Sequence, residues 1–172
     1  MLRDIRDIDA ISLRHPDTVT LYRYWQSKCG HRLMPSRSDI DPTEIPPHLL
    51  PGISLVEAVS DDRRYVYRLM GTAEVEVRGF DPTGKSVLEG FLAPDKDDAL
   101  GCYDKVVATR AALVDPIPFR AVNRRYVTEE TIFLPLSDDG LSVNKIMVFA
   151  ACRRAEDVTL EARHRRKPAV SK

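Results

Sequence analysis

The chain has 172 residues, of which 43% are hydrophobic and 30% are charged. This length suits one domain with a tail, because domains usually run about 100–150 residues. Lysine plus arginine and aspartate plus glutamate both total 26, so no overall field steers the molecule to nucleic acid or to an anionic membrane.

Cysteine usage and hydropathy indicate the compartment. The cysteines, Cys29, Cys102 and Cys152, are far apart and form no C-x-x-C pair, which favours a reducing cytosol. No run reaches the ~18 apolar residues of a transmembrane helix. Residues 1–15 are too charged for a secretory signal. We therefore expect a cytoplasmic protein.

The N-terminal part predicts an arm followed by a helix. Residues 2–13 space isoleucines and leucines in a near-helical pattern among charges, typical of an amphipathic arm or of a lead that folds onto a partner. Pro16 suits a first helical turn, and the helix is expected to run to about Lys28, with Gly30 as its stop. An apolar stripe lies along it at helical spacing: Leu21, Trp25 and Cys29.

A proline-rich connector separates this helix from the sheet. Residues 32–51 contain five prolines, which forbid a long helix or a central strand. Residues 52–60 and 64–71 then alternate and predict a hairpin, joined by a polar turn at 61–63. A short helical turn is expected from Gly71 to Gly79, and the D-P-T-G sequence after it opens another.

The second half predicts one long helix and three strands. Residues 94–112 start with proline and aspartates and carry an apolar stripe at helical spacing. Residues 117–126 and 128–136 alternate, and 145–152 are nearly all apolar. Strands flanking a helical middle, rather than strict strand–helix alternation, indicate an α+β fold with an antiparallel sheet of about five strands.

Catalytic motifs are absent from the sequence. Of the four histidines, His15 and His164 lie in terminal segments, while His31 and His48 flank the connector. No serine lies in a G-x-S-x-G elbow, and no cysteine lies in a nucleophile signature. We expect no catalytic residues and no enzyme.

One phosphate-loop pattern has to be weighed. Residues 79–86, GFDPTGKS, fit G-x-x-x-x-G-K-S letter for letter. A working loop comes after a buried strand and opens a long helix. Here a short helical turn precedes the loop, and Gly90 and Pro94 would cut short any helix after it. The structural context favours a glycine-bearing turn without phosphate.

Metal patterns are equally weak. Cys29 and His31 lie close together, but zinc needs about four ligands at fixed spacing. The aspartates around residue 97 lack the glycine and the terminal glutamate of a calcium loop, and a solvated helix start explains them better. We predict no metal site.

Three motifs carry a family resemblance. They are a Tyr24-Trp25 helix, a P-x-R-x-D-I-D-P segment at 35–42 and a Y-R-L-x-G-T strand at 67–72. Together with the D-x-T-G turn they resemble a PAS-like family of single-domain alphaproteobacterial proteins, over roughly residues 21–153. The resemblance implies a PAS fold and a sensory or protein-interaction module.

The resemblance also suggests a division of the chain. Residues 1–15 would form an arm, residues 16–155 the PAS-like domain with its helix and connector, and residues 156–172 a basic, disordered tail. The tail's RHRRK run lacks interleaved aromatic residues, so we do not expect it to bind nucleic acid. A nucleic-acid adaptor that acts through this tail remains an alternative function.

The resemblance permits tests for cofactors. Haem-binding PAS sensors usually ligate iron through a histidine on the long helix, and residues 94–112 contain none. Flavin photosensors of the light-oxygen-voltage type need a cysteine in an N-C-R-F-L-Q motif, whereas Cys102 lies in ALGCYDK. Neither cofactor is supported, and the cofactor stays unknown.

A PAS cavity between the concave sheet face and the helices is the implied ligand site. Apolar and aromatic side chains would line it for a small apolar or amphipathic ligand. The candidates are Tyr67, Leu69, Tyr103, Val107, Phe119, Phe133 and Phe149. Such residues at strand and helix spacings are more often simple core, and that alternative stays open.

The N-terminal helix is the candidate interface. Leu21, Tyr22 and Trp25 form an aromatic-rich face suited to a homodimer or to a partner protein, while packing within the chain is the alternative.

Arg68, in an apolar strand, needs a counter-charge, and we expect a salt bridge with Glu57 or Asp41.

A small acid–base enzyme in a curved-sheet fold is the other alternative. It would require a carboxylate on an inward strand position beside a tyrosine. The strand carboxylates Glu57, Glu129 and Glu130 are expected to face outward or to lie at an edge. We therefore favour a non-enzymatic sensory module.

Overall fold

A computed structural model describes residues 3–5, 13, 15–91, 95–116, 118–121 and 124–157. The expected basic tail falls on residues 156–172, of which 158–172 lie outside the described residues. Within the described part, no helix is both long and apolar enough to cross a membrane.

The described strands form one antiparallel sheet in the order β1-β4-β6-β7-β2-β3, with β5 paired to β6. Their bounds are β1 Arg3–Ile5, β2 Ile53–Ala58, β3 Tyr65–Met70, β4 Ala112–Asp115, β5 Phe119–Arg120, β6 Tyr126–Leu136 and β7 Lys145–Arg154. The helices are α1 Pro16–Cys29, α2 Thr72–Arg78, α3 Val87–Gly90 and α4 Lys96–Thr109. The expected α+β fold with a five-stranded antiparallel sheet is confirmed, and the short strands β1 and β5 add to it.

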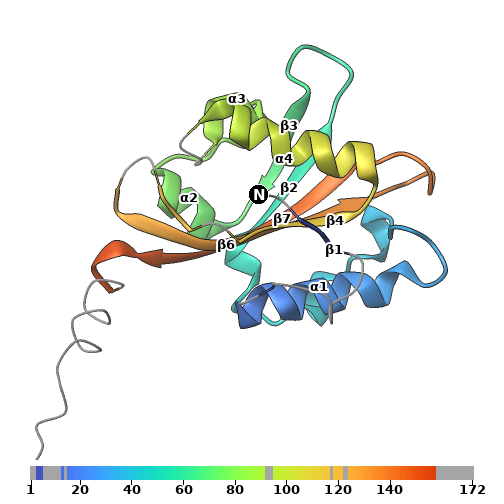
Figure 1. Cartoon of the computed structure of the whole chain (residues 1–172), viewed down its shortest axis with the longest axis horizontal. Helices are drawn as coiled ribbons and strands as arrows, with labels where there is room; N and C mark the ends of the chain where they lie inside the picture. The colour runs from blue at the N-terminus through green and yellow to red at the C-terminus, as the bar shows by residue number, and fades with distance from the viewer. Residues whose placement is uncertain are drawn as a thin grey trace, which may run out of the picture.

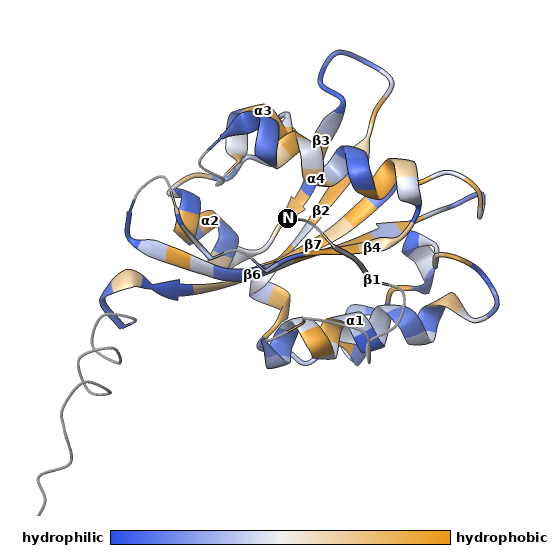
Figure 2. Cartoon of the chain, viewed as in Figure 1, coloured by the Kyte–Doolittle hydropathy of each residue, from blue (hydrophilic) through white to orange (hydrophobic). Residues whose placement is uncertain are grey.

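Helices cover both faces of the sheet (Figure 1). We call the face under α2, α3 and α4 the inner face, and the face against α1 the outer face. Figure 2 shows hydrophobic residues concentrated in the strands between these layers. Successive residues of a strand point to opposite faces, so the central strands β6 and β7 supply apolar side chains to both.

Most predicted elements occur where the sequence placed them. Helix α1 begins at Pro16, its cap His15 accepts from the Asp17 N–H, and it ends at Gly30, whose φ is 57°. The β2–β3 hairpin and the β6–β7 pair are confirmed. The connector carries three 3₁₀ turns, at Arg37–Asp39, Pro42–Glu44 and Leu50–Gly52, and no long helix or central strand, as its prolines predict.

Two parts of the chain differ from the sequence prediction. Residues 3–5 pair with β4 as a strand, whereas the near-helical spacing of residues 2–13 indicates an amphipathic arm or a lead that folds onto a partner. The strand after α4 is Ala112–Asp115, whereas the described residues of 117–126 supply only the two-residue β5 and the first residue of β6. Helix α4 ends early because Arg110 takes a left-handed conformation with φ 54°, and pairing with β6 then holds β4.

Glycine at position 71 is required by space. A Cβ there would lie 2.1 Å from the Pro51 carbonyl oxygen and 2.8 Å from that of Ile53. We predict that Gly71→Ala lowers the free energy of unfolding by about 2–4 kcal/mol, because backbone atoms have to shift. Urea denaturation measures this.

Gly101 within α4 provides the matched control. A Cβ there meets nothing within 4 Å, so Gly101→Ala should stabilise the protein by about 0.5–1 kcal/mol through helix propensity. Equal effects of the two substitutions would contradict the packing described around Gly71.

Candidate functional site

Aromatic side chains meet on the inner face between the sheet and α4. The Tyr103 ring lies 5.3 Å from the Phe133 ring in an edge-to-face arrangement and 5.2 Å from the Tyr65 ring. Tyr67, Tyr103 and Phe133 are all buried. Such pairs add about 0.5–1.5 kcal/mol each beyond the area they bury, so this cluster fixes α4 on the sheet.

A buried ion pair lies beside these rings. Glu74 and Arg78 of α2 approach to 2.5 Å, with only 4% and 8% of their side chains exposed. Arg78 Nε also donates to the Gly90 carbonyl at 2.7 Å, and the Tyr67 hydroxyl donates to the same oxygen at 3.2 Å. The guanidinium further lies 5.7 Å from the centre of the Tyr67 ring. The pair therefore joins α2, β3 and the end of α3.

Burial sets the ionisation of this cluster. Desolvation raises the pKa of Glu74, and the positive charge of Arg78 opposes that rise. Burial likewise raises the pKa of Tyr103 well above its usual range. The carboxylate is thus held by one guanidinium in an apolar layer, which makes the pair sensitive to any change in its surroundings.

The predicted lining residues do not all share this face. Tyr67, Tyr103 and Phe133 come together, and Val107 is partly buried against the same core. Leu69 is 46% exposed, so in this structure it lies outside the buried cluster.

Of the remaining two candidates, only Phe149 can be placed. Phe149 pairs with Ile132, while its neighbour Val148 pairs with Phe133. By strand alternation Phe149 therefore belongs to the outer face, opposite the predicted cavity. The side chain of Phe119 lies outside the described part of the chain.

Sequence reasoning missed Glu74 and Arg78. The TAEVEVR segment reads as a short helical turn between glycines, and no role was predicted for its charged residues. A usable signal was present, because Glu74 and Arg78 flank Val77 on one helical face at i, i+3 and i+4 spacing, and Val77 and Glu74 are both buried.

The prediction for Arg68 is confirmed, since its Nε contacts a carboxylate oxygen of Glu57.

Helix α1 packs on the outer face through its aromatic stripe. Leu21 and Tyr22 are fully buried and Trp25 is 5% exposed. The indole Nε1 of Trp25 donates to the Pro135 carbonyl in β6 at 2.9 Å. These side chains pack within the chain, so an interface formed by them remains a prediction that requires α1 to leave the sheet.

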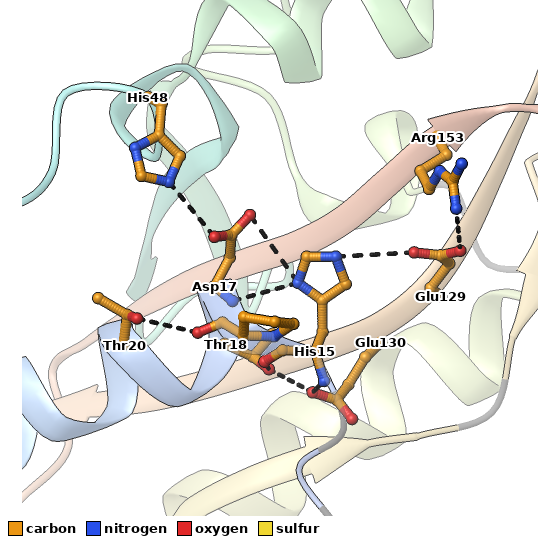
Figure 3. Close-up of polar contacts among 9 residues, drawn as sticks. His15, Asp17, Thr18, Thr20, His48, Glu129, Glu130 and Arg153 are labelled. Carbon is orange, nitrogen blue, oxygen red and sulfur yellow. Dashed lines mark hydrogen bonds and ion pairs between the residues drawn. The ribbon is translucent and has the colours of Figure 1, made fainter. Parts of the chain in front are cut away.

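Polar contacts fasten the N-terminal end of α1 (Figure 3). Glu130 of β6 is only 2% exposed and accepts from the Thr18 hydroxyl and from the His15 backbone N–H at 3.3 Å. His15 Nε2 also lies 3.7 Å from a carboxylate oxygen of Glu129, and His48 Nε2 lies 3.3 Å from Asp17 Oδ1. The expectation that Glu130 faces outward is wrong, because a β-bulge beside it aligns its carboxylate with the helix start.

The phosphate-loop pattern at 79–86 forms a turn. The Gly84 N–H donates to the Tyr67 carbonyl at 2.7 Å, and the Lys85 N–H donates to the Pro82 carbonyl at 2.9 Å. Backbone donors that would cradle a phosphate are therefore used within the fold. The ammonium of Lys85 lies over the Phe80 ring at 5.9 Å.

The cysteines are suited to packing. Burial raises the pKa of Cys29 to about 11 and the pKa values of Cys102 and Cys152 to about 12, so all three remain thiols at neutral pH. Cys102 Sγ donates to the Asp98 carbonyl of its own helix. Among the described residues, no group of three histidine, cysteine or acidic side chains could hold a metal ion.

Comparison with known proteins identifies the family of this fold. The profile of a family described as PAS domain matches residues 13–148, most of the chain. No curated protein matches the sequence.

Several solved structures are similar. A light-oxygen-voltage domain studied with a flavin analogue has 10% identity and a TM-score of 0.45, covering 67% of this chain and 87% of that one. An RNA-binding light-oxygen-voltage receptor has 10% identity and a TM-score of 0.47, covering 97% and 44%. A variant of the fungal photoreceptor VVD has 13% identity and a TM-score of 0.43, covering 82% and 99%.

Arg78→Met tests the buried pair. Removing the guanidinium leaves Glu74 buried without its counter-charge, which should cost about 3–5 kcal/mol of unfolding free energy. The buried carboxyl of the variant is favoured in its protonated form, so its pKa is raised in the folded state. The loss should therefore be small below the ordinary glutamate pKa and should grow as the pH rises from there towards the raised pKa of Glu74. Urea unfolding across pH 4–8 measures this.

The double variant Glu74→Gln with Arg78→Met is the control. It removes both charges, so its cost should be smaller than that of Arg78→Met at neutral pH and nearly independent of pH. If the loss of unfolding free energy in Arg78→Met does not change with pH, Glu74 is not a buried carboxylate held by Arg78.

Thr18→Val tests whether the hydrogen bond from Thr18 to Glu130 holds α1 on the sheet. The substitution keeps the shape but removes a donor from buried Glu130, so it should cost about 1–3 kcal/mol and speed amide exchange in α1. Thr20 provides the control, because its exposed hydroxyl donates to the Pro16 carbonyl in the same helix. Thr20→Val should stay within about 0.5 kcal/mol of the parent protein. Equal losses would show that Glu130 does not hold the helix.

Proposed function

Since this chain belongs to the PAS domain family, we propose that it is a non-enzymatic sensory module whose output is the docking of α1. The single observation that supports this is the arrangement of β6. On the inner face its Phe133 contacts Tyr103 of α4. Towards α1, its Pro135 carbonyl accepts from Trp25 and its Glu130 accepts from Thr18. One strand thus touches both the input and the output helix.

The input is a change at the inner face. A small amphipathic ligand would place its apolar part against Tyr67, Tyr103, Val107 and Phe133, and its polar group near Arg78. The buried pair favours such a ligand, because a guanidinium in an apolar layer binds an acceptor strongly. The chain is tightly packed where α3 ends beside this cluster: a Cβ on Gly90 would lie 2.6 Å from Pro82 and 3.0 Å from Tyr67. A ligand that reaches Arg78 there would have to displace the end of α3.

The output is a surface for a partner protein or a second copy of the chain. When α1 leaves the sheet, it exposes Leu21, Tyr22 and Trp25 together with the outer-face residues that they cover. Aromatic residues of this kind suit the centres of protein interfaces. A ligand that binds better to the form with α1 released shifts the population toward it.

The acid–base enzyme is the weaker alternative. It gains one observation, namely that Glu74 is buried beside Tyr67 and has a raised pKa. The carboxylate is, however, held by Arg78 at 2.5 Å, and that contact has to break before Glu74 could accept a substrate proton. We therefore place Glu74 in the sensing cluster.

Tyr103→Leu tests the coupling through β6. Loss of the ring contact with Phe133 should speed amide exchange in α1 about tenfold more than in β7, which corresponds to about 1.4 kcal/mol of coupling between the two faces. Hydrogen–deuterium exchange with mass spectrometry measures both segments in one experiment.

Val66→Ala is the control for global destabilisation. Val66 is fully buried in β3, at the opposite edge of the sheet from β4. This variant should speed exchange in α1 and β7 equally. If Tyr103→Leu also affects both segments equally, β6 does not connect the faces and the proposal fails.

A further inference from the structure

A groove of about 530 Å³ lies away from both helix-covered clusters. It is formed where α2, the β5–β6 turn and the end of β7 meet. Its lining residues are Glu76, Arg124, Arg125, Tyr126, Arg154, Ala155 and Glu156. The volume falls in the range of about 300–1,000 Å³ typical of small-molecule sites.

Backbone contacts hold the walls of this groove in place. The Ala155 N–H donates to the Arg125 carbonyl at 2.8 Å, which ties the end of β7 to the β5–β6 turn. Within that turn, the Arg124 N–H donates to the Ala121 carbonyl at 2.8 Å. Arg124 is held at φ 59°, a left-handed conformation that a non-glycine residue rarely adopts. The turn thus presents two successive arginines beside the groove.

The arginines form a cationic side. Among the described residues, Arg124 has no carboxylate within ion-pair distance, and it is exposed. Arg154 has two partners, Glu76 at 3.5 Å and Glu156 at 3.7 Å. Both contacts are long and solvent-exposed, and such pairs contribute little. Arg154 can therefore turn to a ligand at small cost.

The carboxylates form an acceptor side. Glu76 accepts from the Tyr126 hydroxyl at 2.8 Å, and both Glu76 and Glu156 contact Arg154. Carboxylates so placed accept hydrogen bonds from hydroxyl or amino groups and repel a second anion. The groove thus offers guanidinium groups to an anion and carboxylate acceptors to a hydroxyl or amino group of the same molecule.

We propose that this groove binds a nucleoside monophosphate. The phosphate would lie between Arg124, Arg125 and Arg154, since guanidinium groups match phosphate oxygens in a bidentate geometry. The ribose hydroxyls would donate to Glu76 or Glu156, and the base would lie against the Tyr126 ring. An extended polyanion fits less well, because the carboxylates would face its further phosphates. This site is separate from the α1 coupling and does not depend on it.

Titration of the full chain with AMP, adenosine and inorganic phosphate tests the proposal. Isothermal calorimetry should show AMP binding at least about tenfold more tightly than phosphate, with no adenosine binding up to about 10 mM. Arg124→Gln and Arg125→Gln should each weaken AMP binding about tenfold or more. Glu76→Gln should weaken AMP binding without weakening phosphate binding.

Arg63→Gln is the matched control, because Arg63 is an exposed arginine in the β2–β3 turn, bound to Asp61. It should leave AMP binding unchanged, and thermal melting should show every variant folded. Absence of AMP binding up to about 10 mM, equal affinity for phosphate and AMP, or equal losses in Arg63→Gln and Arg124→Gln would each overturn the assignment.

Discussion

The fold depends on a strand that has to be buried on both faces. From Ile132 to Leu136 every residue of β6 is buried, because α4 covers one side and α1 covers the other. A strand in this position cannot alternate apolar and polar residues as a half-exposed strand does. Any polar group that is buried on it needs its own partner, and Glu130 finds that partner in the N-terminal end of α1.

The buried carboxylates on the two faces of the sheet are compensated in different ways. On the inner face, Glu74 is neutralised by Arg78 from its own helix. On the outer face, Glu130 receives neutral donors, a hydroxyl and a backbone N–H, near the positive end of the α1 dipole. Both arrangements join a helix to other elements of the fold, so each specifies how that helix lies on the sheet as well as how stable it is.

Signals within a few residues predicted most helices and strands correctly. The strands that were missed are held by partners far along the chain. Prolines, caps and alternation placed α1, the β2–β3 hairpin and the β6–β7 pair, because those signals act within a few residues. Strands β1 and β4 were missed, because they are short and are held by partners far along the chain. The face of Phe149 depends on register, which a single strand does not reveal. Glu74 and Arg78 were missed because charged residues are taken as solvated unless the burial of their helix face is known.

The pairing of β1 with β4 has a consequence for how copies of this chain coexist. An uncovered strand at the rim of a sheet offers a row of free amide and carbonyl groups that a neighbouring molecule can extend into a shared sheet. Arg3–Ile5 takes up that row along β4. Those three residues thus block intermolecular strand pairing along β4. A chain that lacks them would expose the edge of β4, and we expect it to self-associate through that edge.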